Sequence, residues 1–441
     1  MRKWIGAGVV VLLIAGAGYL GAQAYSSQRF EDEMARSIAR LDASPQWQLS
    51  RHDVDSGWFH SSGRIEAHYL DLAEGADAIV IDTPYHAEHG LLETTLGGES
   101  QVRVGDDDET LFGDVLKSDA PVTWKGRFLT RDQRLEASVE VPGFSQRVTV
   151  PASGIEGEMT PPGKIRLDFD GLSLDIVQVG DRVTLDGQAP RLQVVDDEAD
   201  VRLDDVALAG TFKGDDRAFE QQVTLTIPTA TVTPSDGPSV VSKDIRYAMR
   251  ATLDAEQLAM QLKADVGESR IQGQRIFSGS LNMTLDRIDG DAYRALAANL
   301  DSHLGAIQAA IDANDEAALD AALAPLAPQI QAILAGSPRL ALDTFDVDSP
   351  LLGMRMNGSG ELTLDGAGIE SWNPGAMSDQ ATANALIERL EGHLIFNGAP
   401  PLLSMYLGLP TTSDPLKVEL AGGVLDVNGR RMPLLLPELA E

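Results

Sequence analysis

Hydrophobic and polar residues alternate along the middle of the chain, from about Gln48 to Asp286. In one clear run, Ile165, Leu167 and Phe169 are separated by charged residues. Successive side chains of a β-strand point to opposite faces of a sheet, so this pattern predicts strands with one apolar and one polar face. Such strands belong in an antiparallel sheet with one side in water. Further runs of this kind lie at 201–203, 206–208, 223–227, 258–262 and 281–285.

Pairs of aspartate and glycine are expected to mark turns between these strands. They occur at Asp170-Gly171, Asp186-Gly187 and Asp236-Gly237. The apolar positions change parity after Gly171, which predicts a bulge or a turn at that residue.

Helical spacing of apolar residues replaces the alternation in three places. The first is a short stalk over 25–44, in which Phe30, Met34 and Ile38 recur before Pro45 ends the helix. The second is a helical insert over 291–336, rich in alanine and leucine, which Pro325 and Pro328 are expected to kink or split. The third is a late helix over 378–391, with Ser378 as its N-cap.

The C-terminal region, 337–441, returns to strands. Short alternating runs at 417–420 and 424–427 are joined by Gly422-Gly423, and Asn428-Gly429 predicts a hairpin turn into a last strand over 432–436. The expected fold class is therefore α+β and β-dominated. It comprises an N-terminal transmembrane helix, an extended curved antiparallel sheet over 45–290, the helical insert and the late helix.

The N-terminal segment predicts a membrane location. Arg2 and Lys3 precede an uncharged run over 4–24, and about 20 apolar residues span a bilayer as a helix. The flanking cations place residues 1–3 in the cytoplasm and the rest of the chain in the bacterial periplasm. Two interpretations remain. The length of the run favours a retained inner-membrane anchor, whereas its glycines and the Ala22-Gln23-Ala24 site favour a cleaved signal peptide.

Composition excludes several classes of function. The formal net charge is −32 at pH 7, which argues against nucleic acid as a partner because phosphate binding needs lysine and arginine. The chain has no cysteine, so it has no disulfide, no thiolate metal site, no cysteine nucleophile and no lipidated cysteine. The acidic excess is spread along the chain and is expected to be a solvated surface.

No motif in the chain predicts catalysis, a cofactor or a metal. Gly16-Ala-Gly18-Tyr-Leu-Gly21 has the letters of a dinucleotide-binding loop but lies inside the apolar run, with no strand before it. His52, His60, His68, His86 and His89 cluster early in the chain. Gly57 and Gly63 are expected to break the strand between them, so the histidines are interpreted as surface or packing residues. We therefore expect a protein that is not an enzyme, with catalytic, cofactor-binding and metal-binding residues absent.

The most distinctive local string runs from Asp55 to Ser62 and places two large aromatic residues, Trp58 and Phe59, between glycine and serine. One interpretation is a strand that packs Trp58 on the core while Phe59 faces a second layer. The other is a contact with a partner or with lipid. The possible interaction element comprises Gly57, Trp58, Phe59, Ser61, Ser62, His89 and Gly90.

This element carries a resemblance to a known family. A basic start, a glycine-rich apolar anchor and then Gly57-Trp58-Phe59 with Ser61-Ser62 resemble the YdgA-like proteins, which are bacterial inner-membrane proteins grouped as a domain of unknown function. His60 stands where that family usually has serine. Glu88-His89-Gly90-Leu91 resembles a second family element but lacks the proline expected after glycine. The resemblance extends over nearly the whole chain and implies no catalytic residues.

The functional hypothesis is a non-catalytic factor of cell-envelope maintenance. In its sharper form, the sheet presents an apolar groove to lipid or another amphipathic ligand, by analogy with the strand-rich AsmA-type envelope proteins. Against this stands an ordinary closed core formed by the same apolar faces. A protein-interaction or scaffold module of the inner membrane is the second hypothesis, and an uncharacterised periplasmic enzyme is the third.

Overall fold

A computed structural model gives the fold of most of the chain. It describes residues 26–32, 34–36, 38–39, 42, 47–69, 79–104, 121–150, 163–215, 217–300, 303, 305–307, 310, 315–373, 380–410 and 414–434. These residues form two compact units, and the boundary between them falls within a strand, after Pro190. It therefore lies inside the alternating region 45–290.

Unit 1 combines one helix with strands. The helix includes the described residues 26–32, 34–36 and 38–39, which confirms the helix predicted from the spacing of Phe30 and Ile38. It packs on the sheet, where Phe30 is buried. The strands are β1 (Trp47–Ser56), β2 (His60–Tyr69), β3 (Ile79–His89), β4 (Glu93–Val104), β5 (Val122–Leu129), β6 (Arg134–Val141), β7 (Phe144–Val150), β8 (Gly163–Phe169), β9 (Leu172–Val179) and β10 (Arg182–Val195).

The strands of unit 1 pair in an antiparallel sheet. From β1 to β6 each strand pairs with the next along the chain, β9 then pairs with β6, and β10 pairs with β9. Strands β7 and β8 form a separate hairpin between them in sequence. Gly171 lies between β8 and β9 with a φ of +101°, a conformation that only glycine adopts readily. The turn predicted from the change of parity is therefore confirmed.

Unit 2 is a long antiparallel meander in which each strand from β11 to β21 pairs with the next. Its strands are β11 (Ala199–Gly214), β12 (Phe219–Pro234), β13 (Val240–Leu253), β14 (Gln257–Ile271), β15 (Gln274–Asp289), β16 (Arg339–Ser349), β17 (Met354–Leu364), β18 (Leu390–Asn397), β19 (Leu416–Ala421), β20 (Val424–Val427) and β21 (Arg430–Pro433). The described chain is thus β-dominated and antiparallel, as the alternation predicts.

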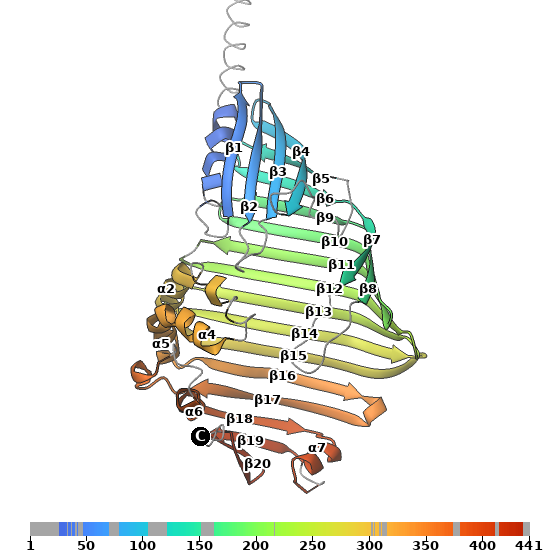
Figure 1. The fold of residues 1–441 in the computed structure, drawn as a ribbon, viewed down its shortest axis with the longest axis vertical. Helices are drawn as coiled ribbons and strands as arrows, with labels where there is room; N and C mark the ends of the chain where they lie inside the picture. The colour runs from blue at the N-terminus through green and yellow to red at the C-terminus, as the bar shows by residue number, and fades with distance from the viewer. Residues whose placement is uncertain are drawn as a thin grey trace, which may run out of the picture. The chain divides into compact units, whose positions relative to one another are not determined.

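The helices of unit 2 interrupt this meander at its turns. They are α2 (Gly290–Leu300), α4 (Glu316–Leu323), η1 (Ala324–Leu326), α5 (Ala327–Ala335), η2 (Pro350–Leu352), η3 (Ile369–Ser371), α6 (Gln380–Ile387) and α7 (Pro401–Tyr406). The predicted helical insert is confirmed, and it is split at Pro325 and Pro328 as expected. Figure 1 shows α2, α4, α5 and α6 at one end of the strands and α7 at the other.

Two small clusters of buried side chains pack these helices on the sheet. Leu253, Leu258 and Ile288 form the first cluster, and Tyr293 of α2 and Ile333 of α5 pack against it. Leu409, Leu416 and Val427 form the second, which α7 joins through Leu403. The helices therefore pack against the ends of the strands.

Three local predictions are wrong. Asp186-Gly187 is not a turn but lies inside β10, where Gly187 pairs with Leu174 of β9 and is buried in the ladder. The late helix stops at Ile387, because Leu390 and Glu391 pair with β17 as the start of β18. Gly63 does not break β2, since it pairs with Tyr85 within a continuous strand.

Other C-terminal predictions hold. Strands β19 and β20 match the predicted runs, and the Asn428-Gly429 turn leads into β21. The late helix's N-cap Ser378 and the end of the predicted strand over 432–436 lie outside the described residues.

The predicted membrane segment over 4–24 also lies outside the described residues. Within the described part of the chain, one helical stretch, Ala317–Ala335, has the length and mean hydropathy of 1.3 that a membrane span requires. It comprises α4, η1 and α5. Its Leu326 is 1% exposed and its Ile333 packs on the first cluster, so this stretch takes part in the fold of unit 2.

Candidate functional site

Trp58 and Phe59 lie at the turn between β1 and β2. The turn closes through a hydrogen bond from the backbone N–H of Gly57 to the carbonyl of His60 at 2.9 Å. The side chains of Trp58 and Phe59 are 58% and 51% exposed. The prediction that Trp58 packs on the core is therefore wrong. The strand ends at Ser56, so both rings belong to a turn and have no sheet face to pack against.

A second apolar turn lies beside the first. Gly90 N–H donates to the carbonyl of Glu93 at 2.6 Å and so closes the turn between β3 and β4. The two residues in this turn, Leu91 and Leu92, are 43% and 51% exposed. Since the N–H of His89 donates to the carbonyl of Phe59 at 2.7 Å, the two turns are neighbours. We call Trp58, Phe59, Leu91 and Leu92 the tip surface.

A buried polar cluster lies directly below the tip surface. The ring of His89, which is 3% exposed, has Ser61 Oγ 2.8 Å from its Nε2 and Thr94 Oγ1 3.0 Å from its Nδ1. Ser26, from the helix, has its Oγ 2.9 Å from Thr130 Oγ1 and 3.5 Å from Thr94 Oγ1. We call these five residues the His89 cluster. It joins the helix to β2, β3, β4 and the turn after β5 through hydroxyl contacts.

The surroundings of His89 favour a neutral ring. Burial lowers its pKa below the ordinary 6.5, an effect that the negative charge of Glu31 opposes and the nearby His60 reinforces. The ring of Phe30 lies against it, with the two centroids 5.3 Å apart. Ser61 is completely buried, so its hydroxyl is closed to a substrate even though the Ser61–His89 contact resembles a nucleophile and its base. The cluster is therefore suited to holding the turns and the helix together.

Further contacts hold the helix of unit 1 against the sheet. Ser27 Oγ donates to the carbonyl of Gly57 at 2.8 Å. Arg51 forms an ion pair with Glu31 at 2.8 Å and also donates from Nε to the hydroxyl of Tyr85 at 2.8 Å. A Cβ at position 63 would lie 2.7 Å from that hydroxyl, so Gly63 makes room for the buried Tyr85 ring.

The structure brings most of the predicted interaction element together, and it adds residues that the sequence did not indicate. Gly57, Phe59, Ser61, His89 and Gly90 meet around the two turns. Ser62 lies apart from them, since it is the residue after Ser61 in β2 and pairs with His86. Ser26, Thr94, Thr130 and the Leu91-Leu92 pair were missed. Isolated hydroxyl residues carry no sequence signal, whereas two adjacent leucines after a glycine could have suggested an apolar turn.

The histidines do not converge on a metal. No group of three or more His, Cys, Asp or Glu within the described residues is placed to hold a metal ion. His60 and His86 stack with their centroids 6.5 Å apart, and His68 faces Glu66 at 2.7 Å.

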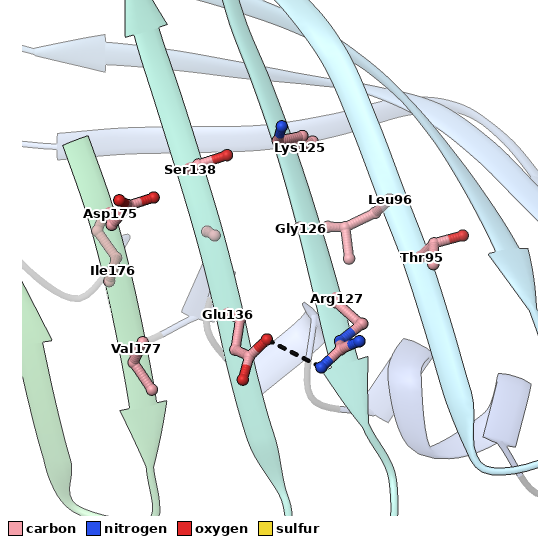
Figure 2. A pocket seen from close by; sticks show the side chains of 11 residues that line it. Thr95, Leu96, Lys125, Gly126, Arg127, Glu136, Ser138, Asp175, Ile176 and Val177 are labelled. Atoms are coloured by element: carbon pink, nitrogen blue, oxygen red, sulfur yellow. Dashed lines mark ion pairs between the residues drawn. The ribbon is translucent and has the colours of Figure 1, made fainter. Parts of the chain in front are cut away.

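An open hollow of about 590 Å³ lies over β4, β5, β6 and β9. Figure 2 shows its lining, in which an ion pair joins Arg127 to Glu136 on neighbouring strands at 3.2 Å. Leu96, Gly126, Ala137 and Ile176 form one row across these strands. Gly126 leaves room for the side chain of Leu96, whose Cγ would lie 3.1 Å from a Cβ at position 126.

One face of the sheet in unit 2 carries apolar side chains in rows. Residues that pair directly across an antiparallel ladder point to the same face. One row over β11 to β16 is Leu208, Leu225, Tyr247, Ala264, Leu281 and Phe345. The next row, over β12 to β16, is Val223, Met249, Leu262, Met283 and Leu342. We call these two rows, together with Leu340, the apolar face.

Part of the apolar face is open to solvent. Tyr247, Met249, Leu262 and Leu340 are 46%, 38%, 39% and 41% exposed. The opposite face differs in character, since the row between the two apolar ones is Thr224, Ala248, Lys263, Asn282 and Thr344. Contiguous exposed apolar side chains of this kind are a recurrent feature of interaction sites in proteins.

Comparison with known proteins places the chain in a family. The family model for a bacterial protein of unknown function, DUF945, matches residues 1–403. The chain belongs to the DUF945 family. No match was found among curated proteins or among solved structures.

The DUF945 match includes the tip surface, the His89 cluster and the whole apolar face. It ends within α7, before the β19 to β21 hairpins. The coarser expectation from the sequence, a bacterial family of unknown function that covers nearly the whole chain, is confirmed. The match itself assigns no reaction or ligand to these DUF945 residues.

Proposed function

We propose that this DUF945 protein is a non-catalytic, single-pass protein of the bacterial inner membrane that acts in cell-envelope maintenance. Its N-terminus is cytoplasmic, its bulk is periplasmic, and the apolar face of unit 2 binds lipid or another amphipathic molecule. The finer placement among YdgA-like proteins is part of this proposal. It is supported by Gly57-Trp58-Phe59, Ser61-Ser62 and His89-Gly90.

The exposed apolar face carries the proposal. Neighbouring strands lie about 4.8 Å apart, so a row across six strands is about 24 Å long. A row of that length suits a chain-like apolar molecule better than a compact metabolite. Each methylene group removed from water contributes about 0.8 kcal/mol, so an acyl chain laid along exposed Tyr247, Met249 and Leu262 has a sufficient driving force to bind.

The membrane location rests on the apolar run over 4–24 behind Arg2 and Lys3. An anchored protein meets lipid at one end of its chain, which gives the apolar face a source of ligand. The net charge of −32 disfavours broad contact between the rest of the surface and anionic head groups.

A scaffold role is the second candidate, and a specific observation favours it. Leu402, Met405 and Tyr406 of α7 are 72%, 61% and 88% exposed, and Leu351 and Leu352 of η2 are 69% and 70% exposed. Exposed large apolar residues on a short helix are typical of a protein contact.

Photo-crosslinking separates lipid binding from a closed or protein-covered face. Full-length protein carrying benzoylphenylalanine at Met249 or at Leu262 is irradiated in cells whose acyl chains are labelled with [14C]acetate. The matched control carries the same group at Lys263, which neighbours Leu262 but points to the opposite face. The proposal expects labelled lipid adducts at 249 and 262 and little at 263. Adducts to protein alone at 249 and 262, or equal labelling at all three positions, would contradict it.

A further inference from the structure

The tip surface departs from the ordinary composition of hairpin turns. Turn residues are usually Gly, Asn, Asp, Ser or Pro, and several described turns of unit 2 follow this rule, for example Ser235-Asp236-Gly237 and Gly422-Gly423. The turn at Pro350–Leu352, with exposed Leu351 and Leu352, is an apolar exception within unit 2. In unit 1 two adjacent turns instead present Trp58-Phe59 and Leu91-Leu92, all more than 40% exposed. The apolar side chains therefore gather on one edge of unit 1.

The chain enters unit 1 at the same edge. Ser26 contacts Thr130 in the turn after β5, and Ser27 contacts Gly57 in the turn that carries Trp58. The apolar run over 4–24 ends two residues before Ser26. Two residues of extended chain reach at most about 7 Å, so the sequence tethers Ser26 close to the end of that run.

We propose that the tip surface rests in the interface of the phospholipid bilayer that residues 4–24 cross. This inference rests on the proposed membrane anchoring. A run of 21 residues is about 31 Å long as a helix, which equals the thickness of the hydrocarbon core. The end of the run therefore lies at the membrane surface, and the tip surface lies there with it.

The side chains fit that depth. Tryptophan favours the head-group region because its ring is apolar and its N–H finds water. Phe59, Leu91 and Leu92 extend the apolar contact across two turns. The neighbouring charges limit it, since Glu88 and Glu93 flank the second turn with side chains 75% and 43% exposed. Contact is therefore shallow, with the rings at the boundary between head groups and acyl chains.

The His89 cluster gives this contact a rigid base. Ser26 of the helix contacts Thr94 of β4 and Thr130, and the ring of His89 contacts Ser61 and Thr94, so the helix is tied to the strands that carry both tips. The helix that follows the apolar run is thus held to both tips by buried contacts at Ser26 and Ser27, so its direction fixes the orientation of the tips.

The absence of cysteine permits a direct test with single-cysteine variants. Full-length Phe59→Cys and Leu92→Cys proteins are labelled with the fluorophore NBD and reconstituted into phosphatidylcholine vesicles, with or without lipid that carries a shallow doxyl quencher. The control is Gln48→Cys, an exposed position at the opposite end of β1. The proposal expects at least a twofold quenching at positions 59 and 92 and none at 48.

A fourth variant, Val11→Cys in the apolar run, tests the anchor with a deep quencher. Quenching at 11 together with positions 59 and 92 that behave like 48 would overturn the tip contact and leave the anchor intact. No quenching at 11 would overturn the anchoring itself. A blue-shifted NBD emission at 59 and 92 without doxyl quenching would show that protein covers the tips, and it would also overturn the proposal.

Discussion

Replacing His89 by alanine tests whether the His89 cluster holds the tips and the helix together. The change removes the ring that contacts Ser61 Oγ at 2.8 Å and Thr94 Oγ1 at 3.0 Å. A buried polar group left without its partner costs about 1–3 kcal/mol. Thr94 keeps a contact of 3.5 Å with Ser26, so the cost at Thr94 lies at the lower end of this range. Together with the cost at Ser61, we expect the variant to lose about 2–4 kcal/mol of stability.

Hydrogen exchange measures this loss locally. Each 1.4 kcal/mol corresponds to a factor of ten, so the amides in 26–32 and 57–61 are expected to exchange ~30- to ~700-fold faster in His89→Ala. Amides of unit 2 should keep their protection. His86→Ala is the matched control, because His86 lies in the same strand with a side chain that is 60% exposed. Equal protection in the two variants would refute the structural role of His89.

Further outcomes follow from the same contacts. Burial lowers the pKa of His89, so the unfolded state takes up a proton at a higher pH than the folded state does. The stability of unit 1 is therefore expected to fall as the pH drops below about 6.5. Hydrogen exchange, corrected for intrinsic rates, gives the free energy of opening, and its dependence on pH should be lost in His89→Gln. Leu253→Ala truncates a side chain that is 3% exposed and is expected to destabilise unit 2 by about 2–4 kcal/mol in urea unfolding, whereas Leu340→Ala, at a side chain 41% exposed, should cost less than about 1 kcal/mol. Intact mass spectrometry of protein from membranes is expected to find Met1 retained, and a chain that begins at Tyr25 would show cleavage instead.

The sequence predicted the strands and the helical insert well because each depends on local periodicity. Alternation in 223–227 and 281–285 directly indicates which residues share a face of a strand. Pro325 and Pro328 directly indicate a break in a helix. The Asp186-Gly187 error has the opposite origin. An Asp-Gly pair favours a turn, yet here pairing with β9 holds Gly187 extended, and long-range pairing is invisible in a local pattern.

The candidate sites were predicted less completely, for a related reason. Trp58 and Phe59 were singled out, but whether they pack or protrude depends on where β1 ends. The contact of Ser26 with Thr130, 104 residues apart in the chain, requires the fold. The apolar face also requires the fold, because each of its rows takes one residue from each of several paired strands. The sequence of a single strand does not show which residues of the other strands lie beside it.

Native mass spectrometry of the full-length protein tests directly whether the apolar face binds an amphipathic ligand. The protein is extracted from membranes and washed in detergent, alongside Leu262→Asp and Lys263→Asp, which place the same charge on opposite faces of β14. Binding at the apolar face predicts a lipid-sized adduct on the unaltered chain and on Lys263→Asp, and its loss from Leu262→Asp. A bare chain in every case, or an adduct that persists in Leu262→Asp, would contradict it.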